Sequence, residues 1–209
     1  MKHPFLPVIP LALAIVGCVP QKAPYRPQTA TDWETAQAAP AAIEALDLTG
    51  QSLPAWPDEM QAFVNLSRVS LRKTGLTEYP RVLGSLPALT WIDLGENRLT
   101  ASPDPALLTQ VTTLYLSDNA IAALPETIGS LTNLVYLNLD RNQLTALPES
   151  IGALTALKWL RLNGNKITAV PDSIAALKGL RRLYLKGNPL TPEEKARLRT
   201  LLPDTELID

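Results

Sequence analysis

The stretch LVYLNLDRNQLTALPESIGAL, Leu134 to Leu154, decides the fold, because its pattern returns along the chain. The next copy runs from Leu157 to Leu177, and the polar residue at the centre of the pattern occurs seven times. It stands at Gln51, Thr74, Asn97, Asn119, Asn142, Asn165 and Asn188, with steps of 23, 23, 22, 23, 23 and 23 residues. Such a period is typical of solenoids, whose stacked repeats present an extended binding surface.

Each copy predicts one short strand and one return segment. From Tyr136 to Asp140 apolar and polar residues alternate, which is typical of a strand with one buried and one exposed face. We therefore expect seven parallel strands about 4.8 Å apart, with the Leu-Pro-x-x-Ile-x-x-Leu segments returning as turns or short helices. The third copy is one residue short and has two prolines between Thr100 and Leu107, so we expect an irregular return there.

The phrase L-x-x-L-x-L-x-x-N-x-L, followed by L-P-x-x-I-x-x-L, resembles the leucine-rich repeat family and its 23-residue class from Ile43 to Leu190. The resemblance implies an α/β solenoid, a horseshoe with a parallel concave sheet. It also implies that the central asparagines form a ladder that satisfies buried backbone groups. Because Thr74 and Gln51 replace asparagine in the first two copies, we expect a looser N-terminal end.

Segments at both ends are predicted to close the array. We divide the chain into a signal segment (1–17), a tether with an N-terminal cap (18–40), the repeats (41–190) and a C-terminal cap (191–209). Within the tether a short helix at residues 31–36 is expected to place Trp33 over the first repeat. At the other end Thr191-Pro192-Glu193-Glu194 reads as a capping box that starts a helix, and Leu207-Ile208 reads as a last strand.

The first eighteen residues have the proportions of a secretory signal, with Lys2 and His3 ahead of an apolar run that is too short to cross a bilayer. Ile15-Val16-Gly17-Cys18 resembles the lipobox of bacterial lipoproteins, which implies cleavage before Cys18 and lipid attachment to it. An ordinary signal with a stray thiol is the alternative. A lipidated chain would be tethered to the cell envelope and not span it. In a Gram-negative host, Val19 after the cysteine would point to the outer membrane.

Charge and residue content argue against several functions. Loss of Lys2 leaves 18 basic residues against 20 acidic ones, and no patch is basic enough for nucleic acid. His3, the only histidine, lies in the signal segment, which removes the usual general base and zinc ligand. Asp93, Glu96, Asp118 and Asp140 could support glycoside cleavage or calcium binding, but a solvated acidic face is the preferred reading. We expect no enzyme activity, metal or cofactor.

The residues on either side of the buried strand leucine should face the solvent on the concave sheet. We call them the concave strip. The third position of the repeats reads Ala45, Arg68, Trp91, Thr113, Tyr136, Trp159 and Arg182, and the fifth reads Asp47, Ser70, Asp93, Tyr115, Asn138, Arg161 and Tyr184. Five of the nine Trp and Tyr residues of the chain fall on this strip.

Exposed aromatic and arginine side chains dominate binding surfaces. We therefore predict a partner site. It comprises Trp91, Asp93, Tyr115, Tyr136, Asn138, Trp159, Arg161, Arg182 and Tyr184. The acidic centre and the basic C-terminal end suggest a polarised partner.

The preferred hypothesis is a monomeric, lipid-tethered module that holds a protein partner, as leucine-rich repeats most often do. Binding of a glycan or peptidoglycan by the same rings is the alternative. Packing of the rings on one another, in a purely structural role, is also open.

Overall fold

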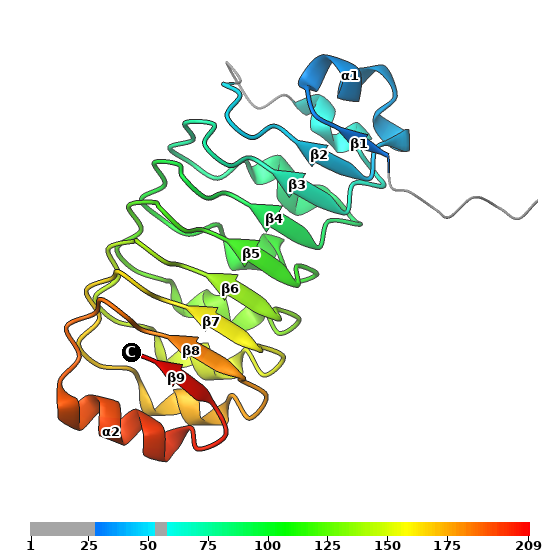
Figure 1. Cartoon of the computed structure of the whole chain (residues 1–209). Coiled ribbons are helices and arrows are strands. Elements are labelled where there is room, and N and C mark those ends of the chain that lie inside the picture. Colours follow the sequence, from blue (N-terminus) through cyan, green and yellow to red (C-terminus); the bar gives the residue numbers. More distant parts are fainter. Residues whose placement is uncertain (1–27, 53–57) are drawn as a thin grey trace, which may run out of the picture.

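Parallel strands, one from each repeat, form one side of the molecule in the computed structural model, which describes residues 28–52 and 58–209 (Figure 1). In this part of the chain nine strands form one sheet in sequential order, and all neighbours are parallel. They are β1 (Thr29–Ala30), β2 (Ala45–Asp47), β3 (Arg68–Ser70), β4 (Trp91–Asp93), β5 (Thr113–Tyr115), β6 (Tyr136–Asn138), β7 (Trp159–Arg161), β8 (Arg182–Tyr184) and β9 (Glu206–Ile208). The seven predicted repeat strands are β2 to β8.

Short 3-10 helices return the chain behind the sheet, as Figure 1 shows. They are η1 (Pro40–Ala42), η2 (Asp58–Ala62), η3 (Arg81–Ser85), η4 (Pro105–Leu107), η5 (Glu126–Ser130), η6 (Glu149–Ala153) and η7 (Asp172–Ala176). Apolar residues from both layers meet in a continuous core, in which Leu137, Leu139 and Ile151 have no exposed surface. The predicted layers are therefore confirmed.

The third repeat carries the expected irregular return. Its helix η4 has three residues where η3, η5, η6 and η7 have five. Pro105 occupies the first turn, and the Asp104 carboxylate accepts a hydrogen bond from the Ala106 N–H (3.0 Å). The two prolines and the missing residue leave no room for a longer helix.

Glycines allow the helix layer to pack closely. A Cβ built on Gly152 in η6 would lie 2.4 Å from the carbonyl oxygen of Ser173 in η7. In the same way, a Cβ on Gly84 would lie 2.5 Å from the Leu107 Cβ. The 23-residue period thus brings successive helices closer together than any side chain at these positions would permit.

A ladder of asparagines closes the turns that follow the strands. The Asn142 side-chain amide donates to the carbonyls of Leu116 (2.9 Å) and Leu139 (3.1 Å), and its Oδ1 accepts from the Ile121 N–H (3.1 Å). Asn97, Asn119, Asn165 and Asn188 repeat this arrangement. These side chains satisfy buried backbone groups, as the resemblance implied.

The ladder stops at Asn97 on its N-terminal side. The Thr74 hydroxyl donates to the carbonyl of Leu71 in its own turn (2.8 Å), while the Gln51 amide donates to the Thr31 carbonyl of the N-terminal cap (2.5 Å). The looser N-terminal end remains a prediction, because the hydrogen bonds show a change of partners and not a change of mobility.

The N-terminal cap begins earlier than the predicted tether allowed. Gln28 accepts hydrogen bonds from the N–H groups of Glu44 and Ala45, and β1 then pairs with β2. Thr29–Ala30 therefore forms an outer strand, preceded by Gln28, and is not part of an extended tether. A two-residue strand has no alternation that a sequence pattern could reveal.

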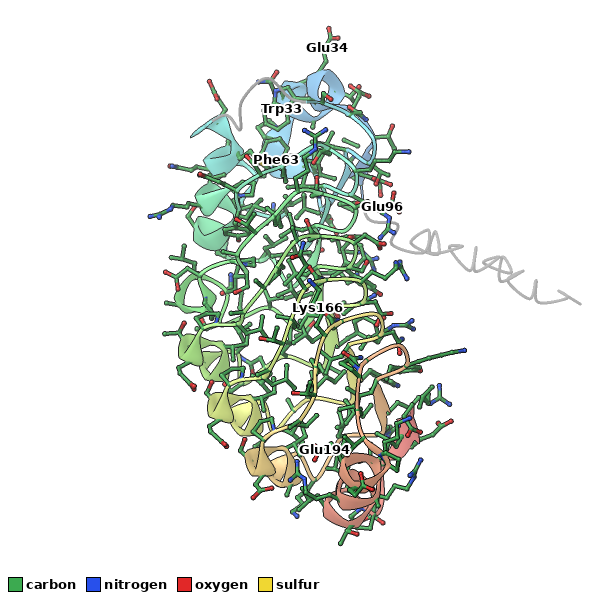
Figure 2. The ribbon with its side chains drawn as sticks, turned by 90° about the vertical axis from the view of Figure 1, so that its left-hand side faces the viewer. Trp33, Glu34, Phe63, Glu96, Lys166 and Glu194 are labelled. Atoms are coloured by element: carbon green, nitrogen blue, oxygen red, sulfur yellow. The ribbon has the colours of Figure 1, made fainter. Side chains whose placement is uncertain are left out.

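A short helix completes this cap as predicted. Helix α1 (Trp33–Ala38) begins after Asp32, whose carboxylate accepts from the Thr35 N–H (2.7 Å). The Trp33 ring lies 5.6 Å from that of Phe63, and Figure 2 shows the two rings together at the end of the core. Trp33 thus covers the first repeats.

The C-terminal cap combines helix α2 (Pro192–Leu201) with β9. Thr191 caps the helix by accepting from the Glu194 N–H (3.2 Å). The Glu194 side chain accepts from the Val170 N–H (2.9 Å) and from Arg197. This carboxylate therefore fastens α2 to the last regular repeat. Leu198 and Leu202 are buried beneath the helix, and β9 adds a final strand beside β8.

Candidate functional site

The parallel register places equivalent strip residues side by side. Trp91 pairs with Thr113, Thr113 with Tyr136, Tyr136 with Trp159, and Trp159 with Arg182. Adjacent strands are about 4.8 Å apart, which is close enough for neighbouring rings to touch. The concave strip is therefore built by the backbone ladder itself, across β3 to β8.

Four rings form a continuous aromatic stack across four consecutive strands. Trp91 and Tyr115 have ring centroids 5.4 Å apart, Tyr115 and Tyr136 4.9 Å, and Tyr136 and Trp159 6.4 Å. Tyr115 stands at the fifth position and fills the gap beside Thr113, whose small side chain interrupts the third-position row. The interplanar angles of 53°, 37° and 46° are tilted geometries that aromatic pairs favour over face-to-face stacking.

Two arginines contact aromatic rings of the strip, one at the N-terminal end of the stack and one on the strand beyond it. The Arg68 guanidinium lies 4.4 Å from the Trp91 ring centroid, and that of Arg161 lies 4.7 Å from the Tyr184 ring centroid. Cation–π contacts of this kind hold a positive charge over an aromatic face. Arg161 also donates a hydrogen bond to the Asp140 carboxylate (2.7 Å). Its side chain is therefore held by both Asp140 and the Tyr184 ring.

The predicted aromatic side chains do not stand free. Trp91, Tyr115, Tyr136, Trp159 and Tyr184 are all half-buried. Each of the first four rings covers part of its neighbour, and the Arg161 guanidinium covers Tyr184. The stacking predicted as the structural alternative is thus present. It leaves the outer edges of the rings accessible, so stacking and partner binding are compatible.

The acidic face predicted at the centre of the strip is instead a set of ion pairs. Arg72 lies 2.6 Å from Glu96 and 3.6 Å from Asp93. Arg141 bonds to Asp118 (2.6 Å), and Arg161 bonds to Asp140 (2.7 Å). The expectation of exposed carboxylates is wrong for Asp93 and Asp140, which are 8% and 2% exposed. Each of these carboxylates is neutralised by an arginine from an adjacent repeat, since the parallel register brings equivalent positions of neighbouring repeats side by side.

Burial and hydrogen bonding shift the pKa values of these groups in different directions. Burial raises the pKa of Asp93, although the Gly95 N–H (2.7 Å) and Arg72 oppose the change. The hydrogen bond from Arg141 lowers the pKa of Asp118. Burial within the stack raises the pKa of Tyr136 to about 12, so this phenol is neutral at physiological pH.

The remaining predicted site residues have individual roles. Asn138 accepts from the Asp140 N–H through its Oδ1 (2.9 Å) and closes the turn after β6. Arg182 is exposed and forms an ion pair with Glu206 of β9 (2.6 Å). Both stay on the accessible side of the sheet.

Cys18 and the predicted signal segment lie outside the described residues. Within the described part of the chain, no helix is both long enough and apolar enough to cross a membrane. Across residues 28–52 and 58–209, acidic side chains nowhere gather in threes as a metal site would require.

Sequence reasoning missed two features of the surface. Arg72 and Arg141 neutralise the centre, but they lie after the strands and outside the alternating pattern. A cavity of about 580 Å³ also lies beside the irregular third repeat, lined by Tyr79, Ser102, Pro103, Pro105 and Pro125 among others. The short segment with two prolines was the available signal for this cavity.

Comparison with known proteins agrees with this architecture. Profiles described as "Leucine rich repeat" and "Leucine-rich repeat region" match residues 87–144 and 125–202. The chain therefore contains leucine-rich repeats, and its described residues have the fold of a leucine-rich repeat solenoid.

Solved structures show the same fold in bacteria and plants. A leucine-rich repeat protein of Leptospira interrogans is 30% identical (TM-score 0.68), with 86% of this chain and 57% of that chain covered. The ectodomain of the membrane receptor kinase GASSHO1/SCHENGEN3 from Arabidopsis thaliana, in complex with CASPARIAN STRIP INTEGRITY FACTOR 2, is 29% identical (TM-score 0.63), with 75% and 20% covered. This chain thus spans less than two thirds of either protein.

An internalin C2 from Listeria monocytogenes shares the fold at 22% identity, with a TM-score of 0.68 and coverage of 87% of this chain and 75% of that one.

Proposed function

We propose that this protein is a binding module of the cell envelope, held there by a lipid on Cys18, which recognises a protein partner through the concave strip. The observation that carries the proposal is the aromatic stack from Trp91 to Trp159. It presents four half-buried rings on consecutive strands of a rigid sheet. Rings already ordered by their neighbours lose little conformational entropy when a partner covers them.

Two further observations support a polypeptide as the ligand. The central ion pairs occupy the carboxylates that would otherwise be available for sugar hydroxyls, which weakens the glycan alternative. The Arabidopsis receptor ectodomain, which is similar to this chain, was solved in complex with another factor. The strip therefore resembles a surface for a polypeptide more than one for a sugar ring.

The proposal is tested by asking whether a blocked strip loses its partner. Alanine at Trp91, Tyr136 and Trp159 removes the rings but also their mutual packing. Thr113→Arg is a sharper change, because Thr113 lies between Trp91 and Tyr136 in the register and a long side chain there would cover the rings without removing them. Thr168→Arg is the matched control, since Thr168 is exposed and outside the strip.

Each protein is immobilised and exposed to solubilised envelope material, after circular dichroism has shown equal folding. We expect the parent and Thr168→Arg to retain the same protein, and Thr113→Arg and the triple alanine variant to lose it. Retention of equal material by all four proteins would contradict the strip as a protein site. Retention of glycan alone would establish the alternative.

The lipid anchor has its own test. Cys18→Ser is expected to abolish lipid attachment and move the protein from the membrane fraction to the soluble one, because two or more acyl chains are what hold such a protein at a bilayer. Mass spectrometry of the N-terminal peptide measures the lipid directly. An unmodified Cys18 in the mature protein would show that the signal segment is of the ordinary kind.

A further inference from the structure

Positive charge accumulates at the C-terminal end of the repeats. Between residues 157 and 190 the only acidic side chain is Asp172, which bonds to Arg197. The same segment has seven basic residues, namely Lys158, Arg161, Lys166, Lys178, Arg181, Arg182 and Lys186. The repeats that contain β7 and β8 are therefore strongly basic, in contrast to the chain as a whole.

Part of this charge is already neutralised. Arg161 is paired with Asp140 (2.7 Å), and Arg182 is paired with Glu206 (2.6 Å). Together with the pairs made by Arg72 and Arg141, these contacts pair the carboxylates beside the central rings with arginines. The centre of the strip therefore gives little electrostatic preference for either sign of partner charge. Arg68, over the Trp91 ring at the N-terminal end of the stack, forms no ion pair with a described residue.

The two ends of β8 differ from this centre. Arg181 directly precedes the strand and Lys186 follows it by two residues, and both are exposed. Neither forms an ion pair with any residue in 28–52 or 58–209. In the sequence they lie on either side of Tyr184. The Arg161 guanidinium lies over the Tyr184 ring. A pair of uncompensated cations thus brackets the last aromatic ring of the strip.

We infer that the partner is a polypeptide with an acidic segment, and that this segment lies over β7 and β8 between Arg181 and Lys186. The inference rests on the proposed function and adds an orientation to it. An uncharged or aromatic part of the partner covers the stack from Trp91 to Trp159, while aspartate or glutamate side chains meet the basic end. Charge complementarity of this kind fixes the register of a complex and speeds its formation.

The test uses the purified full-length protein in detergent and fluorescently labelled poly-L-glutamate as the probe. Binding is followed by fluorescence anisotropy in the parent, in Arg181→Ala/Lys186→Ala, and in Lys166→Ala/Lys178→Ala. The last variant is the matched control, because it removes two exposed basic residues from the segment between β7 and β8, both at least four residues before the start of β8. We expect about tenfold weaker binding in the first variant and a change below about twofold in the control.

Further probes decide the class of ligand. Equal binding of poly-L-lysine, equal weakening by both double variants, or no binding of poly-L-glutamate overturns the inference. Equal affinity for heparin shows a site for any polyanion and overturns the assignment to an acidic polypeptide. A rise in salt should weaken the binding, because exposed charges are screened.

The retention assay separates this inference from the proposed function. A partner lost by Thr113→Arg but retained by Arg181→Ala/Lys186→Ala leaves the proposed function standing and overturns the acidic orientation. A partner lost by both variants supports both. If Thr113→Arg has no effect on retention, the proposed function fails whatever poly-L-glutamate does.

Discussion

Replacement of Asn142 by alanine tests how far the asparagine ladder holds the solenoid together. The side chain is 7% exposed, donates to the carbonyls of Leu116 and Leu139, and accepts from the Ile121 N–H. Alanine would leave the Ile121 N–H without a partner. The carbonyls of Leu116 and Leu139 would each lose one of two partners, because the amides of Asn119 and Asn165 also donate to them. At about 1 to 3 kcal/mol for the unsatisfied N–H group and about 0.5 kcal/mol for each of the two lost carbonyl bonds, we expect a loss of about 2 to 4 kcal/mol.

This loss is large compared with the roughly 5 to 15 kcal/mol of a typical domain. It should lower the midpoint of urea unfolding by about 1.5 M, for a denaturant slope near 2 kcal/mol per M. Circular dichroism of the purified protein measures the midpoint. Because Asn142 lies in the fifth of seven repeats, its loss should weaken contacts with both neighbours.

Asn133→Ala is the control for this experiment. Asn133 is exposed on the surface and donates a single hydrogen bond, to the Thr109 carbonyl (2.8 Å). Its replacement should cost about 0.5 to 1 kcal/mol. If Asn142→Ala lost no more stability than Asn133→Ala, the ladder would not be a main stabilising element, and the reasoning from buried backbone groups would be refuted.

Three other changes give distinct outcomes. Gly152→Ala should cost about 1 to 3 kcal/mol in urea unfolding, because the new Cβ meets the Ser173 carbonyl; an unchanged midpoint would show that the helix layer can separate freely. Tyr79→Phe should be neutral or stabilising by up to about 1 kcal/mol, since the buried hydroxyl has no hydrogen-bond partner among the described residues. A marked loss of stability in thermal unfolding would reveal a partner. Tyr136 has its pKa raised from 10.0 to about 12, so folding stabilises the neutral phenol and this contribution is lost as pH rises from 10 toward 12. Tyr136→Phe should remove that part of the alkaline loss, and the tyrosinate absorbance of the parent should show one late-titrating group that the variant lacks.

The repeat architecture could be predicted because each repeat is stabilised by its immediate neighbours. Alternation around Leu137 and the 23-residue period define the strand, its buried face and its register without knowledge of distant contacts. The outer strand at Thr29–Ala30 could not be predicted, because two residues carry no period. Its place depends on backbone hydrogen bonds from Glu44 and Ala45 to Gln28.

The strip could be predicted as a list of residues but not as a surface. The alternation of apolar and polar residues shows which side chains point away from the core. It does not show their ring contacts and ion pairs, which depend on the turns that follow the strands. Glu96, Asp118 and Arg141 hold positive φ angles of 52°, 58° and 53°, at the repeat position that is Gly164 or Gly187 further along. These left-handed residues direct the charged side chains, and a strand pattern says nothing about their direction.

The aromatic stack links stability to recognition. Each ring buries one side against its neighbours and leaves an outer edge accessible, so the packing that stabilises the sheet also orders the surface before any partner arrives. Ion pairs around the stack cancel the nearby charge, whereas Arg181 and Lys186 at the last repeat do not form such pairs within the described residues. Contact area is therefore concentrated in the centre, and most of the basic side chains that form no ion pair lie at the C-terminal end. A surface divided in this way would obtain affinity from the rings and orientation from the cations, which explains why the two sets of variants should have separable effects.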